Sequence, residues 1–422
     1  MTHVNMPADF LWGAATAGHQ IEGDNTTSDT WFLENVSPTI FKERSGKACN
    51  SWQLWETDLD LVKGMGLNAY RFSIEWARVE PVEGEFSTEA LDHYEAVIDG
   101  CLARGLAPVV TFNHFTAPHW FAMRGAWLDP QGAALFARYC EAVMQRFGER
   151  IAAAVTLNEP NLPELLSWIE LPAFVTDLTR ATLEEARKVT GAERYISSNV
   201  ANAEDFPALK EGFTLAHIAA RDAIKRHRPE LPVGISIAMV DDVALAGGEE
   251  QVAQKRAALY DHWLRLAVDD DFIGVQNYER MYYGPDGALP LAPDAVLNDG
   301  GREVEPDSLR GAVEYAHEVS GRPVFVTEHG VGTDDDAIRV DFLPKAIDGL
   351  LRAKAAGVPV IGYCHWSLLD NFEWIFGFGP KFGLHSVNRE TFERTAKPSA
   401  QVFADHVAAV TLKRGAHDRA HR

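Results

Sequence analysis

Residues 131–160 read QGAALFARYCEAVMQRFGERIAAAVTLNEP and contain the unit from which the fold can be predicted. Apolar residues recur at helical spacing over Gln131–Phe147, which predicts a helix with one buried face. Ala153–Leu157 is a short apolar run, typical of a strand buried on both faces. The polar residues Asn158, Glu159 and Pro160 follow at once. A helix, a buried strand and a polar strand end together indicate a parallel sheet covered by helices.

The same alternation runs through the whole chain. The other expected strands are Leu11–Ala15, Ala69–Ser73, Pro108–Phe112, Val233–Ala238, Phe272–Gln276, Val324–Thr327 and Val360–Trp366. The other expected helices are Leu54–Met65, Thr88–Arg104, Leu215–His227, Gln251–Val268, Leu309–Val319, Asp341–Ala356 and Ser399–Val407. This α/β pattern favours closure into a (β/α)8 TIM barrel over an open sheet. The active site of such a barrel lies at the C-terminal ends of the strands.

The domain organisation can be predicted because strands and helices alternate along the chain without an interruption. The 422 residues contain neither a linker rich in Pro, Gly or Ser nor an internal repeat of fixed period. We therefore predict a single catalytic barrel over residues 1–412 and a polar, disordered tail over residues 413–422. A dinucleotide-binding sheet is disfavoured, because Gly13–Gly18 lacks the glycine spacing that such a site needs after its first strand.

Charge and composition narrow the range of partners. Lys and Arg number 39 against 61 Asp and Glu, a net charge of −22 that repels nucleic acid and anionic membranes. No apolar run reaches the roughly 18 residues of a membrane-spanning helix. Met1–Met6 lacks the features of a secretory signal, and the four cysteines show no pairing pattern, so we expect a cytoplasmic protein. The sequence is compatible with a homo-oligomer.

Polar and aromatic residues gather at one end of the predicted strands. They are Gln20 and Glu22 after the first strand, Arg71 in the second, His114 after the third, Asn158 and Glu159 after the fourth, Tyr278 after the sixth, Glu328 after the seventh and Trp366 at the end of the eighth. Residues with purely structural roles would be spread over both ends. The bias toward the C-terminal ends therefore predicts a functional site there.

Glu159 and Glu328 are the candidate reactive groups. Two carboxylates that face each other across a barrel mouth suit the cleavage of glycosidic bonds, where one protonates the leaving oxygen and the other attacks the anomeric carbon or activates water. Their surroundings must differ so that only one is protonated. Arg71 and Tyr278 are the predicted partners that keep Glu328 charged. Alternatively, each glutamate caps the helix that follows it.

Six sequence blocks in order resemble glycoside hydrolase family 1, the family of retaining β-glucosidases. The blocks are Phe10–Thr16, Gln20–Gly23, Asn68–Trp76, Asn158–Pro160, Thr327–Gly330 and Trp366–Trp374, followed by Phe382–Leu384. The resemblance implies that Glu159 is the acid/base and Glu328 the nucleophile, supported by Arg71 and Tyr278. It also implies a set of sugar-binding residues: Gln20, His114, Asn158, Trp366, Glu373 and Trp374.

This chain departs from the family pattern at several positions. His19 stands where Tyr is common, His329 where Asn is usual, and Gln276-Asn277-Tyr278 replaces the usual Asn-Tyr-Tyr. The family's glycine- and proline-rich loop on the leaving-group side is missing after Pro160. Residues 161–202 read as partly helical sequence instead, over Glu164–Ile169 and Asp177–Lys188. The sugar side of the pocket is thus better specified than the leaving-group side.

The expected function is that of a retaining exo-β-glycosidase, in the first place a β-glucosidase, acting on a small-molecule β-glycoside or oligosaccharide without cofactor or metal. Transfer of the sugar to an alcohol would use the same residues. A 6-phospho-β-glycosidase is disfavoured, because the Glu373 carboxylate would repel a phosphate. A catalytically silent sugar-binding barrel would be expected to have lost one of the two carboxylates. A metal-dependent hydrolase would need a histidine cluster at a strand end.

Overall fold

The computed structural model describes residues 10–168 and 172–420. Eight parallel strands close into a barrel in the order β1-β11-β10-β7-β5-β4-β3-β2. They are β1 (Leu11–Ala15), β2 (Ala69–Ser73), β3 (Ala107–Asn113), β4 (Ala153–Asn158), β5 (Val233–Ala238), β7 (Phe272–Asn277), β10 (Val324–His329) and β11 (Val360–Trp366). The predicted (β/α)8 barrel and all eight strands are confirmed.

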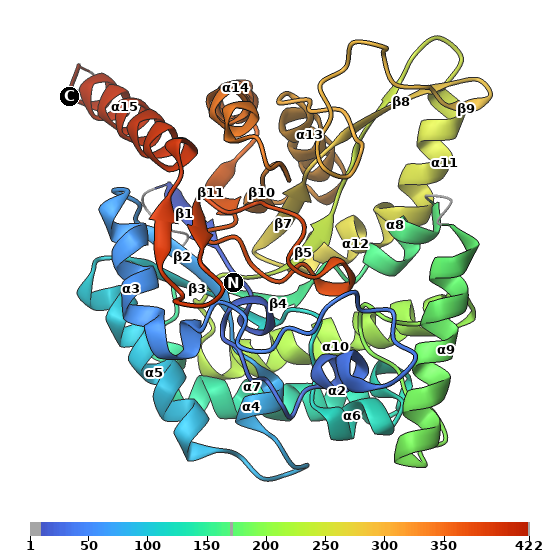
Figure 1. Ribbon diagram of the computed structural model, residues 1–422. Coiled ribbons are helices and arrows are strands. Elements are labelled where there is room, and N and C mark those ends of the chain that lie inside the picture. Colours follow the sequence, from blue (N-terminus) through green and yellow to red (C-terminus); the bar gives the residue numbers. More distant parts are fainter. Residues whose placement is uncertain (1–9, 169–171, 421–422) are drawn as a thin grey trace.

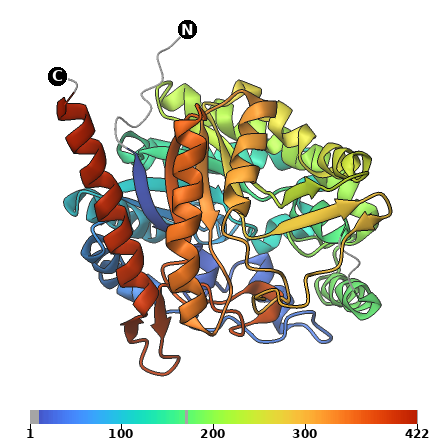
Figure 2. The same ribbon diagram turned by 90° about the horizontal axis from the view of Figure 1, so that it is seen from above.

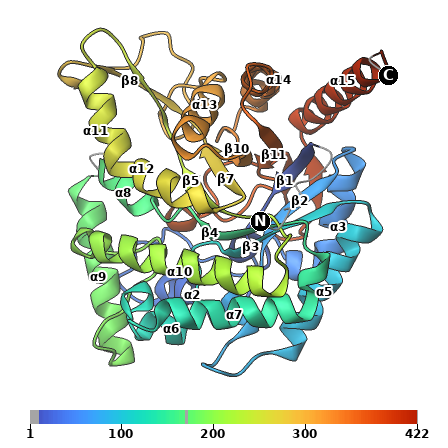
Figure 3. The same ribbon diagram turned by 180° about the vertical axis from the view of Figure 1, so that it is seen from behind.

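A ring of helices surrounds the barrel (Figures 1 and 3). Its members are α3 (Ser51–Gly64), α5 (Thr88–Ala103), α7 (Gly132–Phe147), α10 (Phe206–His227), α11 (Glu249–Leu259), α12 (Asp261–Leu266), α13 (Ser308–Ser320), α14 (Asp336–Ala355) and α15 (Pro398–Ala420). Figure 2 shows α14 and α15 side by side along the barrel. Apolar residues spaced for one helix face, such as Phe136, Cys140 and Val143 of α7, are buried in the large apolar cluster of the protein.

Further helices and two small sheets lie outside the barrel strands and the helices just named. The helices are α1 (Gly18–Ile21), α2 (Asp29–Asn35), α4 (Trp76–Val79), α6 (His119–Met123), α8 (Leu162–Trp168) and α9 (Ala173–Thr190). Two small sheets pair β6 (Asp241–Ala244) with β8 (Arg280–Gly284) and β9 (Gly287–Ala288), and β12 (His385–Val387) with β13 (Arg394–Ala396). Because β6 follows β5 and β8 follows β7, this pair continues two neighbouring barrel strands beyond the rim.

Several expected helices have other bounds in the structure. The helix expected over Leu215–His227 begins at Phe206 as α10, and two further differences involve identifiable hydrogen bonds. The helix expected over Gln251–Val268 is broken at Tyr260, which lies between α11 and α12. Tyr260 is buried, and its hydroxyl accepts a hydrogen bond from the Val240 amide at 3.2 Å, so the side chain ties the break to the rim. α14 begins at Asp336, before the expected Asp341, because the Asp335 carboxylate accepts from the Ala337 amide and caps it.

The structure describes the C-terminal segment of the chain but not its first nine residues. Residues 1–9, which include the stretch read as lacking a secretory signal, lie outside the described residues. α15 is helical through Ala420, within the segment assigned to a tail, and the division between residues 1–412 and 413–422 stays a prediction. No helix within residues 10–168 and 172–420 combines the length and the apolar character needed to cross a membrane.

The interior of the barrel separates an apolar floor from a polar mouth. Apolar side chains from β1, β2, β3, β4, β7 and β10 fill the lower barrel, among them Val109, Val155 and the edge-to-face pair Phe272 and Phe325. Arg71 lies above them with no exposed surface. The packed floor holds the strands in a fixed register, so the side chains at their C-terminal ends are held at defined positions.

Candidate active site

The two candidate carboxylates lie on the same rim. Glu328 is in β10, and Glu159 directly follows β4, with β5 and β7 between these strands in the ring. Both are buried, with 8% of Glu159 and 3% of Glu328 exposed. Glu159 has a φ of 46°, which costs on the order of 1–3 kcal/mol for a residue with a β-carbon. Its amide donates to the Ser236 carbonyl at 2.8 Å, which holds this conformation.

Two donors hold the Glu328 carboxylate. The Arg71 guanidinium donates from Nη1 to Oε1 at 2.6 Å, and the Tyr278 hydroxyl donates to Oε2 at 2.7 Å. Arg71 is fixed in turn by bonds to Thr111 Oγ1 at 3.1 Å and to the Thr327 carbonyl at 3.2 Å. The structure therefore brings Arg71 and Tyr278 to the carboxylate for which they were predicted, and both contacts favour its charged form.

The surroundings of the two carboxyl groups differ in charge. Burial raises the pKa of Glu159 well above its usual value, and the neighbouring Glu328 charge raises it further. Burial raises the pKa of Glu328 as well, but the Arg71 guanidinium and the Tyr278 hydroxyl oppose that rise. The pKa of Glu159 is therefore raised more than that of Glu328, and the protonated form is favoured more strongly at Glu159. This is the asymmetry that the chemistry of paired carboxylates requires.

Asn158 is joined to the same network. Its Oδ1 accepts from Arg71 Nη2 at 2.6 Å and from Gln276 Nε2 at 2.7 Å. Its Nδ2 is buried and has no hydrogen-bond partner among the described residues. Gln276 was not among the predicted site residues. The signal that could have found it is its place at the end of β7, where the family's Asn-Tyr-Tyr is rewritten.

Four rings form one wall of the mouth. His114 stacks on Trp366 with a centroid distance of 5.5 Å and an interplanar angle of 18°. Trp374 stacks on His114 at 6.1 Å, and His19 on Trp374 at 5.7 Å with an angle of 9°. Burial lowers the pKa of His114 well below its usual value, so its ring is neutral. Such a surface can cover the apolar face of a pyranose.

His19 belongs to this row of rings and is itself bonded to a buried carboxylate. The sequence analysis identified His19 only as a departure from the family pattern. Its Nε2 lies 2.8 Å from Glu34 Oε1, and neither side chain is exposed. The other Glu34 oxygen accepts from the Ser45 amide and hydroxyl, both at 2.8 Å. His19 thus connects Trp374 to a fixed carboxylate at the edge of the barrel.

Gln20 and Glu373 bring further polar atoms to the mouth. Gln20 Nε2 donates to Asn371 Oδ1 at 3.1 Å and to the Phe372 carbonyl at 2.8 Å. Burial, together with the Glu328 charge, raises the pKa of Glu373 to about 8. Among the described residues, several buried atoms of the candidate site have no hydrogen-bond partner: Gln20 Oε1, His114 Nδ1, Asn158 Nδ2, Gln276 Oε1 and Glu373 Oε1. Buried polar atoms normally have partners, so this set is suited to a ligand with many hydroxyl groups.

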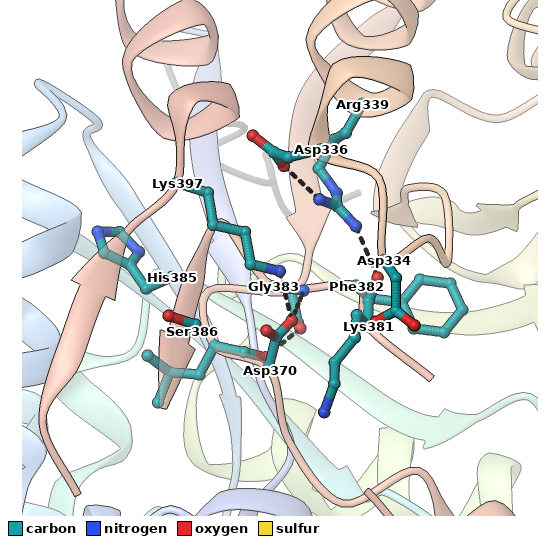
Figure 4. Close-up of polar contacts among 12 residues, drawn as sticks. Asp334, Asp336, Arg339, Asp370, Lys381, Phe382, Gly383, His385, Ser386 and Lys397 are labelled. Atoms are coloured by element: carbon teal, nitrogen blue, oxygen red, sulfur yellow. Dashed lines mark hydrogen bonds and ion pairs between the residues drawn. The ribbon is translucent and has the colours of Figure 1, made fainter. Parts of the chain in front are cut away.

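A polar cluster holds Asp370, which lies three residues before Glu373 in the loop after β11 (Figure 4). Asp370 Oδ1 accepts from Lys397 Nζ at 2.7 Å and from the Gly383 amide at 2.9 Å. A β-carbon on Gly383 would lie 2.1 Å from the Asp370 nitrogen, so only glycine allows this approach. Arg339 ties the neighbouring turn by donating to the Lys381 carbonyl at 2.6 Å. The start of the loop that carries Glu373 is thereby tied to Lys397, which directly precedes α15, and the turn at Lys381 is tied to α14.

Residues 161–202, expected to be partly helical in place of the family's glycine- and proline-rich loop, contain two helices among their described residues. α8 and α9 cover most of the two stretches expected to be helical, while Ile169 lies outside the described residues. A hollow of about 480 Å³ lies on the β6–β8–β9 extension and is lined by apolar residues such as Leu245, Leu289 and Leu291. Within the described part of the chain, no three His, Cys, Asp or Glu residues are grouped so that they could hold a metal ion.

A family model described as Glycosyl hydrolase family 1 matches residues 2–265 and 287–411. The chain belongs to glycosyl hydrolase family 1. The resemblance seen in the six blocks is confirmed, and the protein is a glycosidase. The unmatched stretch 266–286 includes Tyr278, so the position of this residue beside Glu328 comes from the structure itself.

Relatives match along nearly the full chain. A β-glucosidase of Agrobacterium sp. is 29% identical over 456 residues, which cover 94% of this chain and 94% of the relative. The crystal structure of the β-glycosidase BGL167 is 45% identical, with a TM-score of 0.89, and covers 94% of this chain and 96% of its own. The apo structure of a β-glucosidase 1317 is 39% identical, with a TM-score of 0.90, and covers 95% and 98%.

Proposed function

We propose that this glycosidase is a retaining, exo-acting β-glucosidase in which Glu159 is the acid/base and Glu328 the nucleophile. The observation that carries the assignment is the unequal treatment of the two carboxyl groups. Arg71 and Tyr278 bind both oxygens of Glu328, whereas burial and the Glu328 charge raise the pKa of Glu159. A nucleophile must be ionised and an acid protonated, and this arrangement supports both states at once.

The reaction has two steps in this proposal. A Glu328 oxygen attacks the anomeric carbon while the bond to the leaving oxygen breaks, and Glu159 gives its proton to that oxygen. The glycosyl group is then bound to Glu328 as an ester. In the second step Glu159 removes a proton from water, the water oxygen attacks the anomeric carbon, and the Glu328 carboxylate is released. Two inversions at one carbon give a product that retains the β configuration.

The remaining site residues bind the sugar. Trp366 covers the apolar face of the ring, and Gln20, His114, Glu373 and Trp374 hydrogen-bond its hydroxyls. Asn158 binds the 2-hydroxyl, a contact that strengthens in the transition state. The support for these roles is the set of buried, unpartnered polar atoms together with the stacked rings. We infer an exo action because both carboxyl groups are almost fully buried, which favours access by the terminal sugar of a substrate.

Glucose is the proposed sugar, in keeping with the activity named for the Agrobacterium relative. A 6-phosphoglycoside is disfavoured by the buried Glu373 carboxyl group, which offers no positive charge to a phosphate. Sugar transfer to an alcohol would use the same residues. A silent sugar-binding barrel is disfavoured because both carboxylates and their partners are present. The four cysteines are free and buried, which supports a cytoplasmic location.

The experiment that tests this proposal uses two variants with an aryl β-glucoside and azide. Glu328→Ala abolishes hydrolysis, and azide restores turnover with an α-glycosyl azide as product, because the anion attacks the face that Glu328 occupied. Glu159→Ala with azide gives a β-glycosyl azide, because the anion replaces water on the ester intermediate. Full hydrolysis by Glu328→Ala, or azide products of the opposite configuration, would contradict the assignment.

A further inference from the structure

The orientation of the Asn158 amide follows from the donors around it. A guanidinium group can only donate hydrogen bonds, so the atom 2.6 Å from Arg71 Nη2 must be the Asn158 oxygen. The same oxygen lies 2.7 Å from the Gln276 amide, which must therefore present its nitrogen. Asn158 Nδ2 and Gln276 Oε1 are consequently left facing away from these contacts. Arg71, Asn158 and Gln276 are therefore joined by two hydrogen bonds in which every donor and acceptor is defined.

The two atoms left over are a donor and an acceptor. Both Asn158 Nδ2 and Gln276 Oε1 are buried and have no hydrogen-bond partner in the described part of the protein. Leaving a buried polar atom unpaired is unfavourable, because the atom has lost its hydrogen bonds to water and gained none in return. Because these two atoms lie in the candidate site, a ligand that supplies the missing partners would be favoured there. A hydroxyl group, which both accepts and donates, is a suitable partner.

Gln276 lies level with the proposed nucleophile. β7 and β10 pair in parallel, and the backbone positions of Gln276 and Glu328 are partners in that register. The side chains of adjacent partners in a sheet point to the same face, so both enter the barrel mouth. One Arg71 guanidinium binds Glu328 through Nη1 and Asn158 through Nη2. The Asn158 amide therefore lies beside the carboxylate that attacks C1, where it meets the substituent on C2.

We propose that Gln276 is a positioning residue that makes this enzyme require a 2-hydroxyl group on its substrate. A single bond from Arg71 would leave the Asn158 amide free to turn about that contact. The second donor, Gln276 Nε2, fixes the plane of the amide and directs Nδ2 toward the 2-hydroxyl oxygen. The proposal rests on the proposed function, because it needs a sugar whose C1 is attacked by Glu328.

The test compares an aryl β-glucoside with its 2-deoxy counterpart for the wild type, Gln276→Leu and Gln276→Glu. Gln276→Leu removes the donor at similar volume, and Gln276→Glu places an acceptor against Asn158 Oδ1. Each variant lowers kcat/KM for the glucoside by about tenfold, the equivalent of one lost hydrogen bond. The kcat/KM of the 2-deoxy substrate changes less than about twofold. Comparison with the wild type cancels the intrinsic reactivity of the 2-deoxy compound.

The matched control is Ser236→Ala. Ser236 is buried on the adjacent β5, and its hydroxyl bonds Thr327 Oγ1 at 2.9 Å instead of Asn158. This variant changes kcat/KM for both substrates by the same factor. An equal fall for both substrates in the two Gln276 variants would overturn the proposal and leave Gln276 a structural residue. A wild type that hydrolyses neither substrate would instead refute the proposed function.

Discussion

Arg71 Nη1 lies 2.6 Å from Glu328 Oε1 in a buried ion pair that joins residues 257 positions apart in the chain. Burying two charges is costly unless their geometry and remaining hydrogen bonds are well satisfied. Here the guanidinium also binds Thr111, the Thr327 carbonyl and Asn158. The ion pair therefore favours the charged form of Glu328, and the same guanidinium holds the amide beside it.

Replacing Arg71 by Met should move the acidic limb of the kcat/KM profile to higher pH. The guanidinium lowers the pKa of Glu328, so its removal raises that pKa, and the ionised form is reached only at higher pH. We expect kcat/KM at the optimum to fall on the order of 100-fold. The measurement is a pH profile with an aryl β-glucoside, which reports the free enzyme.

Arg394→Met is the control for this variant. Arg394 also forms a buried ion pair, at 2.8 Å with Asp58, but makes no bond to either candidate carboxylate in the described structure. Its loss should lower stability and leave both limbs of the profile in place. If the acidic limb of Arg71→Met is unchanged or moves to lower pH, the assignment of the charge to Glu328 is contradicted.

Replacing Glu373 by Gln should move the alkaline limb of the kcat/KM profile to lower pH. The Glu373 charge raises the pKa of Glu159, so a neutral amide allows Glu159 to lose its proton sooner. The effect should be largest near and above pH 8, because Glu373 itself has a pKa of about 8. The exposed Glu390→Gln is the matched control and should leave the limb unchanged. An alkaline limb that rises in Glu373→Gln would show that another group sets it.

Replacing Asp370 by Asn should destabilise the protein by about 1–3 kcal/mol. The change leaves Lys397, whose side chain is 16% exposed, without its charge partner in the cluster of Figure 4. Because the cluster anchors the loop of Glu373, KM for an aryl β-glucoside should also rise. Unfolding in urea measures the free energy, and steady-state kinetics measure KM.

Asp341→Asn provides the comparison for this change. Asp341 pairs with Lys345 at 2.6 Å, but both side chains are at least 60% exposed. Exposed pairs contribute roughly 0–1 kcal/mol, so the variant should unfold almost as the wild type does. If Asp370→Asn destabilises the protein no more than Asp341→Asn, the cluster does not anchor the loop.

The sequence by itself determined the barrel, the order of its strands and the residues that meet at its mouth. Alternating apolar runs and amphipathic stretches are local patterns, and the C-terminal ends of parallel strands must share one rim. Glu159 and Glu328 could therefore be placed together from strands three positions apart in the ring. The break at Tyr260 was not predicted, and the contact of its hydroxyl with the Val240 amide joins residues that the sequence does not show to be close.

Only the tertiary structure decided the protonation preferences and side-chain orientations of these residues. Which carboxyl group keeps the proton depends on the depth of burial and on donors from other strands, such as Arg71 and Tyr278. The part played by Gln276 depends on the direction of an amide that Arg71 fixes from across the barrel. Electrostatic and hydrogen-bond energies change steeply with distance and orientation, and a linear sequence contains neither.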